Sequence, residues 1–138
     1  MGKSSRAALA CPCGLGLPYA ECCGPAHDGQ PPATAEALMR SRYSAFALAN
    51  DEYVLSSWHP DTRPSAIEAD PHLRWVGLEV LESAGGGLFD AEGVVEFRAF
   101  FRDQGRPGEL SERSRFVRHG GRWLYWGPIL TNGLLPGL

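Results

Sequence analysis

All four cysteines of this 138-residue chain lie in one short segment near its start. They form two close pairs, Cys11 with Cys13 and Cys22 with Cys23, in the spacing C-x-C-x8-C-C. Glycine and proline between and after the pairs allow the loop to turn back on itself. Such a loop brings four thiolates together, which is the tetrahedral sulfur set that zinc favours. The spacing predicts a Zn²⁺ knuckle whose role is structural, because four sulfurs leave no open position for water.

Two other chemistries compete with metal binding. Disulfides need an oxidising compartment, and a bond between adjacent Cys22 and Cys23 would close a strained ring. A redox dithiol usually has a Cys-x-x-Cys motif before a helix, and the chain has none. His27 follows Cys23 by four residues and can replace one thiolate, although a surface histidine is the simpler interpretation. A four-cysteine metal site remains the preferred hypothesis.

The amino-acid composition limits the classes of protein to which the chain can belong. Hydrophobic residues make up 43% and charged residues 21%, which fits one folded domain rather than a disordered acidic chain. No apolar run approaches the ~20 residues that a membrane helix needs, and no secretory signal precedes the cysteines. We therefore expect a cytoplasmic protein with no membrane span. The net charge of -3 argues against nucleic acid as the partner.

The first half of the chain after the cysteines has helical periodicity. Thr34 is the predicted N-cap of a helix from Ala35 to about Ala49, which carries Arg42 on its apolar face. Asn50 or Asp51 is expected to begin a second helix that runs through Trp58. A third short helix is expected over 63–70.

Beyond residue 71 the hydrophobic period changes to two, as in strands. Strands are expected over 74–81, 88–101, 109–118 and 122–128, with a tight hairpin turn at 119–121. The segment 88–101 is either one long strand or a hairpin broken near 90–93. One face of the second strand carries Val95, Phe97, Ala99 and Phe101. Helices followed by an antiparallel meander predict an α+β fold in which the helices pack on one face of a curved sheet.

The segment Cys-Pro-Cys-Gly-Leu-Gly-Leu-Pro-Tyr-Ala-Glu-Cys-Cys-Gly at 11–24 resembles the SEC-C motif. This motif is a zinc-binding knuckle found at the end of the preprotein translocase ATPase and in many bacterial proteins. The resemblance implies iron as a second candidate metal and a docking role near secretion or protein quality control. Leu15 stands where the motif usually has serine, and Leu17 and Pro18 stand at usually basic positions. The nearly uncharged knuckle argues against a partner that recognises lysines.

Longer strings extend the resemblance to nearly the whole chain. They are Met-Arg-Ser-Arg-Tyr-Ser-Ala-Phe at 39–46, Trp-His-Pro at 58–60, Trp-Val-Gly-Leu at 75–78, Val-Glu-Phe at 95–97, Glu-Arg-Ser-Arg-Phe at 112–116 and Trp-Leu-Tyr at 123–125. Together they are similar to the YchJ family. The resemblance implies a SEC-C knuckle at 1–26, followed at 27–138 by a cone-shaped domain like nuclear transport factor two (NTF2) and the cystatins. Cone domains often pair through the convex sheet, so a homodimer is expected.

A curved sheet wrapped around a helix usually leaves a cleft. The candidates to line this predicted pocket are Arg42, Tyr43, Trp58, Trp75, Glu96, Glu112, Arg113, Arg115 and Trp126. If Arg42 points into the core it needs a carboxylate, because an isolated buried charge is costly. Glu96 and Glu112 are the candidate partners. A structural brace is preferred over a catalytic pair.

These patterns favour a metal-binding adaptor. Its knuckle would dock to a protein partner, and its cone domain would bind a peptide or a small ligand. The alternative is an isomerase or dehydratase that uses the cleft, with His59 and Glu96 as weak catalytic candidates. A simpler role for His59 is a His-Pro helix stop. A deep cavity with an unpaired titratable group would favour the enzyme, and a filled core would favour the adaptor.

Overall fold

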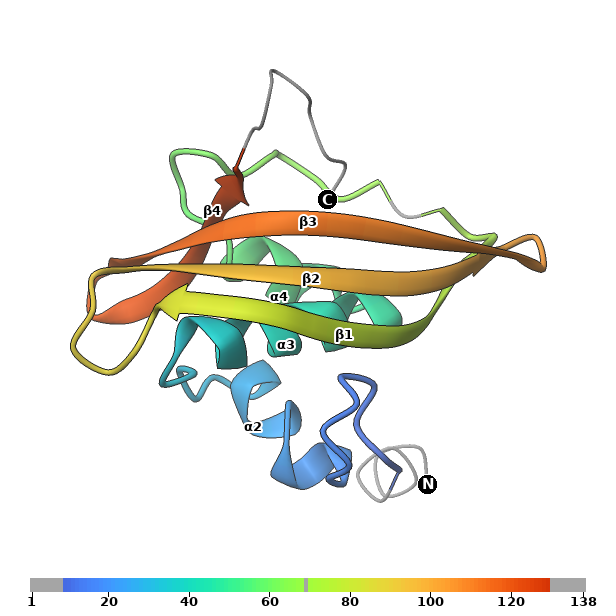
Figure 1. Cartoon of the computed structure of the whole chain (residues 1–138), viewed down its shortest axis with the longest axis horizontal. Helices are drawn as coiled ribbons and strands as arrows, with labels where there is room; N and C mark the ends of the chain where they lie inside the picture. Colours follow the sequence, from blue (N-terminus) through green and yellow to red (C-terminus); the bar gives the residue numbers. More distant parts are fainter. Residues whose placement is uncertain (1–8, 69, 130–138) are drawn as a thin grey trace.

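The computed structural model describes residues 9–68 and 70–129. Its short N-terminal elements are the 3-10 helix η1 (Tyr19–Glu21) and α2 (Gly24–His27). The two helices of the main body are α3 (Ala35–Ala47) and α4 (Asp51–Ser56). The strands are β1 (Leu73–Gly85), β2 (Glu92–Asp103), β3 (Arg106–His119) and β4 (Arg122–Pro128). Helices α3 and α4 lie behind the sheet, and the cysteine segment lies below them, beyond the β1 edge (Figure 1).

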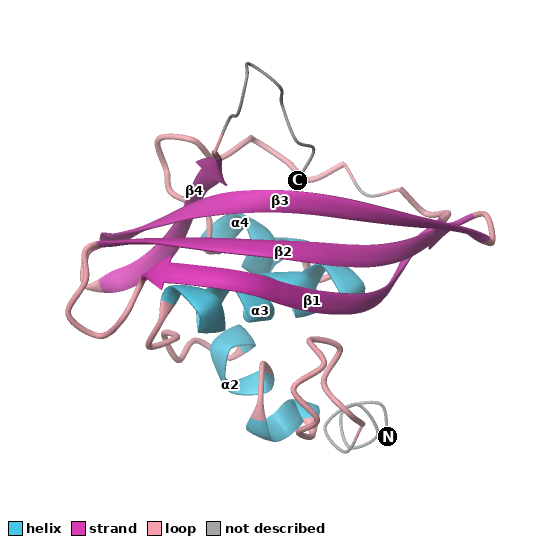
Figure 2. Ribbon diagram, in the orientation of Figure 1, coloured by secondary structure: helices cyan, strands magenta, loops and turns pink. Residues whose placement is uncertain are grey.

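The four strands form one antiparallel meander in the order β1-β2-β3-β4, which confirms the predicted α+β class (Figure 2). Register shifts interrupt β1 at two places and β4 at one, where Trp126 is the extra residue opposite β3. Such irregularities bend a strand and increase its twist, which helps the sheet to wrap around a helix. The predicted turn before β4 is also present. Gly120 and Gly121 both have positive φ, 62° and 83°, as a two-residue hairpin of the I′ kind requires.

Helix α3 begins where the sequence predicts. The Thr34 side chain accepts a hydrogen bond from the Ala37 amide at 3.1 Å. The helix ends at Ala47, and α4 follows with Asn50 as its cap, which accepts from the Tyr53 amide at 3.1 Å. The described part of the chain contains no helix long and apolar enough to cross a membrane.

The third helix expected over 63–70 is a wrong prediction. Residues 63–68 and 70 form irregular, mostly exposed chain, and only Ile67 among them is partly buried. A helix this short depends on an apolar face that packs against the core. A single partly buried side chain provides no such face.

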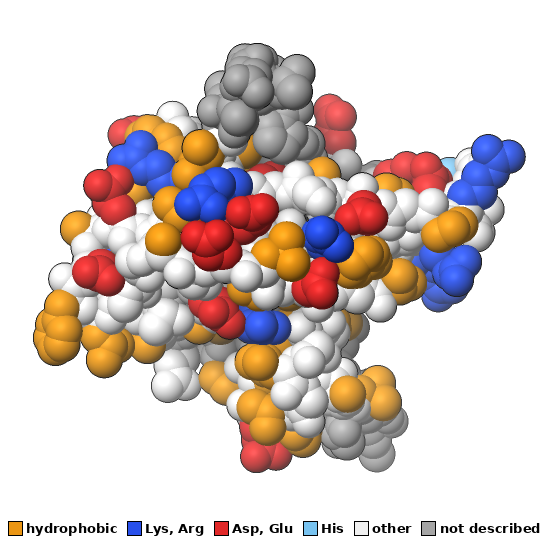
Figure 3. Space-filling model, viewed as in Figure 1, with side chains coloured by type: hydrophobic (Ala, Val, Ile, Leu, Met, Phe, Trp, Pro, Cys, Tyr) orange, Lys and Arg blue, Asp and Glu red, His pale blue; other side chains and the backbone are white. Residues whose placement is uncertain are grey.

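The core lies between α3 and one face of the sheet. Leu38, Met39 and Tyr43 of α3 pack with the buried residues of β2, which confirms the predicted inner face. Cys11, Cys13 and Cys23 belong to the same buried cluster. The other face of the sheet carries intermingled acidic and basic side chains (Figure 3). Their ion pairs include Arg113 with Glu96 at 3.0 Å.

Gly93 of β2 permits a close approach that no side chain would allow. A Cβ added there would lie 2.5 Å from Gly86 Cα and 3.0 Å from Ala35 Cβ at the start of α3. We predict that Gly93→Ala lowers the free energy of unfolding by about 1–3 kcal/mol. Gly127→Ala in β4 is the matched control, since a Cβ there meets nothing within 4 Å. Its effect should stay within about 0.5 kcal/mol in urea melts. Equal effects of the two substitutions would contradict this packing.

Candidate metal centre

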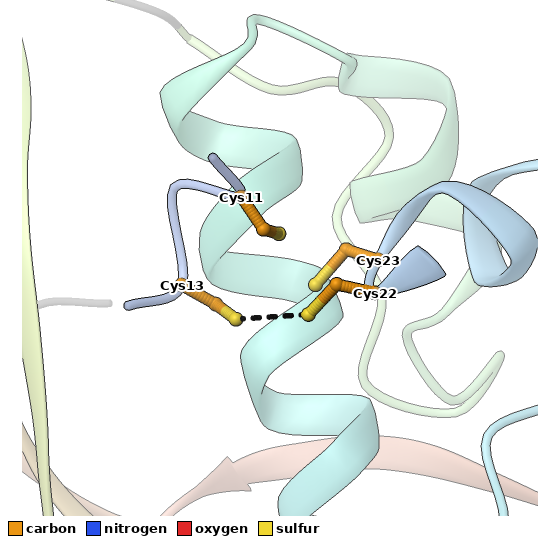
Figure 4. Close-up of side chains that lie close together, drawn as sticks. All are labelled: Cys11, Cys13, Cys22 and Cys23. Atoms are coloured by element: carbon orange, nitrogen blue, oxygen red, sulfur yellow. Dashed lines mark hydrogen bonds between the residues drawn. The ribbon is translucent and has the colours of Figure 1, made fainter. Parts of the chain in front are cut away.

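The four cysteine side chains converge on one point. All four sulfur atoms lie within 4.8 Å of one another. Cys11 and Cys13 approach from the N-terminal loop, and Cys22 and Cys23 from the chain that leads into α2 (Figure 4). A zinc ion with four sulfurs at about 2.3 Å places them about 3.8 Å apart. The donor set therefore fits one tetrahedral thiophilic ion with small side-chain adjustments.

The loop folds back as its glycines and prolines predict. The Cys11 amide donates to the Leu17 carbonyl at 2.8 Å, and the Tyr19 amide donates to the Leu9 carbonyl at 2.8 Å. Gly14 makes the turn with φ of 83°, and its amide donates to the Cys11 carbonyl at 3.2 Å. These backbone bonds carry the first cysteine pair towards the second.

The electrostatics of the cluster favour a bound cation. Cys13 is completely buried, Cys11 and Cys23 are nearly so, and Cys22 is partly exposed. Hydrogen bonds from neighbouring thiols hold the pKa of Cys11 well below its usual range. Burial raises the pKa of Cys22 to about 12, and the thiol contact with Cys11 raises the pKa of Cys23 further. Several thiolates this close repel one another, so full ionisation requires a metal ion, which displaces the protons.

Helix α3 supports the cluster from behind. The Ser44 hydroxyl donates to Cys23 Sγ at 3.2 Å, and its oxygen lies 3.4 Å from Cys11 Sγ. Arg40 Nη1 donates to the Cys13 carbonyl at 3.0 Å. Ser44 is not among the residues that the sequence predicts for the site. Its only signal was a small hydroxyl residue on the buried side of α3.

His27 links the cysteine segment to α3. Its Nδ1 lies 2.6 Å from the Tyr19 hydroxyl, and its Nε2 donates to the Ser41 carbonyl at 2.8 Å. Both ring nitrogens therefore have protein partners. The metal-ligating cluster found in the described residues consists of the four cysteines, without His27.

Four of the nine predicted pocket residues line an interior cavity or an outer groove. Arg42, Tyr43 and Trp75 line an interior cavity of about 20 Å³ between α3 and the sheet. Trp58 lines an outer groove of about 780 Å³, and Phe46 and Trp75 line both spaces. A space of 20 Å³ holds about one water molecule. The interior is therefore nearly filled.

Three other predicted pocket residues lie on the opposite face of the sheet. Glu96 pairs with Arg113, and Arg115 pairs with Glu92. Successive strand residues alternate between faces, so these residues cannot join Phe97 and Ser114 in the core. Trp126 is also away from the interior cavity, 5.7 Å from the guanidinium carbon of Arg115.

Glu112 lies inside, but it forms no ion pair with Arg42 among the described residues. Its carboxylate accepts from the Tyr125 hydroxyl at 2.8 Å and from the Ser114 hydroxyl. The expected contact of Arg42 with Glu96 or Glu112 is therefore corrected. Arg42 Nη1 donates instead to the Val54 carbonyl at 2.8 Å and to the Ser57 hydroxyl. Its interior site is made of helix acceptors and aromatic rings.

His59 stands apart from the interior cavity. Its Nδ1 accepts a hydrogen bond from the Asp61 amide at 3.0 Å, and its ring packs against Trp126 at 4.9 Å and His119 at 4.6 Å. The His59 amide donates to the Tyr125 carbonyl at 2.8 Å. Helix α4 ends at Ser56, before Trp58 and three residues before His59, so the predicted His-Pro helix stop is corrected. The contacts of His59 instead tie the chain that follows α4 to β4.

Known families match both parts of the chain. Residues 10–25 match the SEC-C motif, and residues 34–128 match the middle NTF2-like domain of YchJ. A UPF0225 protein of Streptomyces coelicolor is 51% identical over 116 residues, which cover 83% of this chain and 90% of that protein. A UPF0225 protein of Chromobacterium violaceum is 48% identical over 130 residues, covering 91% and 96%.

Two solved structures share the architecture. The solution structure of a SEC-C motif containing protein from Rhodopseudomonas palustris has 34% identity and a TM-score of 0.77, covering 90% of this chain and all of that one. The crystal structure of a SEC-C motif containing protein from Psychrobacter arcticus has 28% identity and a TM-score of 0.73, covering 94% and 87%.

The hydroxyl of Ser44 provides a test of the centre. We predict that Ser44→Ala lowers zinc affinity by roughly 10-fold or more, because groups that hydrogen-bond metal ligands orient them. Competition with a chromogenic chelator measures the affinity. Ser41→Ala on the same helix is the control, since the Ser41 hydroxyl bonds to the Leu38 carbonyl and the Tyr53 hydroxyl and has no hydrogen bond to a cysteine sulfur among the described residues. Equal losses in the two variants would show that Ser44 has no specific role at the metal.

Proposed function

Since the chain belongs to the YchJ family and combines its NTF2-like domain with a SEC-C motif, we propose that it is a zinc-binding docking protein. In this proposal Zn²⁺ is a structural ion held by the four cysteines, with iron as the alternative metal. The knuckle docks to a protein partner, in secretion or protein quality control, and the cone domain binds a small ligand or a peptide. Free thiols suit a reducing compartment, so the cytoplasm is its proposed location.

The observation that carries the proposal is the closed thiolate cluster. Four cysteine sulfurs complete a tetrahedral shell and leave no position for a substrate or a reactive water. An ion held in this way fixes the loop that surrounds it. We propose that the metal stabilises the conformation of this loop and therefore the surface that a partner contacts.

That surface is apolar and nearly uncharged. Leu9, Leu15 and Leu17 of the knuckle are 64%, 52% and 45% exposed. Three exposed leucines on one small loop are the kind of anchors that a partner buries. We propose that they contact an apolar groove of the partner protein.

Binding is better supported than the alternative of an isomerase or dehydratase. The interior cavity is small, and the carboxylate of Glu112 inside the core already accepts hydrogen bonds from Tyr125 and Ser114. The other two acid–base candidates, Glu96 and His59, do not line that cavity. A homodimer through the outer sheet face would have to accommodate the ion pairs of that face.

The metal is tested directly on native protein. Chain purified without added metal should contain about one zinc per molecule by elemental analysis, and the ion should protect the cysteines from thiol reagents. Because protons compete for the thiolates, zinc affinity should rise with pH and fall as the thiols become protonated. Protein that is metal-free and still ordered at residues 9–26, or cysteines found in disulfides, would contradict the proposal.

Docking is tested separately from metal binding. We predict that replacing Leu15 and Leu17 together by Ser leaves zinc content and the melting temperature nearly unchanged but removes the partner from pull-downs. Cys22→Ser with Cys23→Ser should remove both the zinc and the partner. Leu81→Ser is the surface control, because Leu81 is 43% exposed on β1. A partner retained by the double leucine variant would exclude the knuckle as the docking site.

A further inference from the structure

Arg42 carries a buried positive charge that forms no ion pair with any carboxylate of residues 9–68 and 70–129. The residue is 4% exposed, and it takes part in no ion pair of the described residues. Nη1 donates to the Val54 carbonyl and, at 2.7 Å, to the Ser57 hydroxyl. Nη2 is also buried, and it has no hydrogen-bond partner within the described chain. Burial lowers the pKa of Arg42 to about 10, so the side chain stays protonated at neutral pH.

A second buried donor without an acceptor lies beside it. Trp58 Nε1 is inaccessible to solvent and has no hydrogen-bond partner in the described residues. The guanidinium carbon of Arg42 is 5.0 Å from the centre of the Trp58 ring. Buried donors nearly always find an acceptor, so two unsatisfied donors in one cluster point to a group supplied from outside the chain.

Glu112, the buried acid of β3, is not the hydrogen-bond acceptor of Arg42 Nη2 or of Trp58 Nε1. The Tyr125 ring centre lies 4.4 Å from the guanidinium carbon of Arg42, and the Tyr125 hydroxyl donates to Glu112. Glu112 attracts Arg42 through space, without an ion pair between them. The charge is partly balanced at a distance, and the acceptor position beside Arg42 is not provided by Glu112.

The space next to Arg42 is small and apolar. The interior cavity that Arg42 lines is also bounded by Met39, Phe97 and Ala99. Phe46 and Trp75 line both this cavity and the outer groove. Because the cavity holds only about one water, a larger ligand would need one of these rings to move, which would join the cavity to the groove.

The lining of the outer groove restricts the charge of such a ligand. Asp51, Glu68 and Asp70 lie along it, and its apolar wall includes Ile67 and Leu73. Carboxylates at the entrance repel a ligand with several negative charges. A single anionic head on a short apolar tail is the chemistry that satisfies both the interior donors and the groove.

We propose that Arg42 and Trp58 bind the carboxylate of a small aliphatic monocarboxylate, with a chain of two to four carbons, whose tail lies among Met39, Phe97 and Ala99. This inference gives a chemical class to the ligand-binding part of the proposed function, on which it rests, and it is independent of the metal. The Arg42 guanidinium supplies the charge-assisted bond, and the Trp58 indole N–H supplies the second donor.

The NMR signals of the two proposed donors, Arg42 and Trp58, report directly on ligand binding. Zinc-loaded full-length chain labelled with ¹⁵N is titrated with sodium propionate, at an ionic strength held constant with sodium chloride, and followed by heteronuclear NMR. The Trp58 indole and Arg42 Nε–H signals should shift and saturate, with a dissociation constant on the order of 1–10 mM for so small a ligand. The Trp123 indole is the internal control, because it already donates to the Ala33 carbonyl at 3.2 Å. Propionamide, a neutral molecule of similar shape, should bind at least about 10-fold more weakly.

Two variants separate binding from folding. Arg42→Met keeps the length of the side chain without its charge, and should abolish saturation of the Trp58 signal. Trp58→Phe keeps the ring without the N–H and should weaken propionate binding several-fold, read from Arg42 Nε–H. If the Arg42→Met variant does not fold, the Trp58→Phe variant tests the proposed binding site by itself.

Three results would overturn the inference. They are shifts equal to those caused by sodium chloride, saturation that survives loss of the Arg42 charge, and a cavity that holds only an ordered water beside Arg42 whatever the propionate concentration. Zinc content is measured in the same samples. A negative result with zinc retained would remove the monocarboxylate and leave the metal-dependent docking function standing.

Discussion

Helix α3 packs on two sides, and the rest of the structure depends on this. One side covers the sheet through Leu38, Met39 and Tyr43, and the other meets the cysteine segment through Arg40 and Ser44. Because Cys11, Cys13 and Cys23 share one buried cluster with the residues of the sheet, the knuckle closes the end of the main core. A metal ion held by these sulfurs would therefore act on the packing of α3 as well as on its own loop.

Local sequence signals predicted most of the fold. The Thr34 cap, the inner face of β2 and the two-glycine turn before β4 depend on neighbouring residues, and the structure confirms all three. The cysteine spacing predicted the convergence of the sulfurs for the same reason. The helix expected over 63–70 was wrong because its stability depended on a tertiary surface that the segment does not meet.

The pocket was harder to predict because it depends on how distant elements face one another. Strand alternation separates Glu112 from Arg113, but only the register of the sheet decides which of them faces α3. Ser44 acquires its role from the loop that packs on it, which no periodicity in α3 reveals. The domain boundary at residue 26 stays a prediction, and the contacts of Arg40 with Cys13 and of Ser44 with Cys11 and Cys23 cross it.

Arg42 connects the two halves of the functional argument. The sequence predicted that Arg42 lies on the apolar face of its helix and pairs with an acidic side chain. In the structure its guanidinium group instead donates to the Val54 carbonyl and packs against the rings of Trp58 and Tyr125. A buried cation of this kind would be easier to replace by an apolar side chain than to keep, if it served packing alone. In our proposal an external anion, rather than a brace, accounts for the charge and for an Nη2 without a hydrogen-bond partner among the described residues. The knuckle would then determine where the protein docks, while the small cavity determines which small molecule it carries or senses.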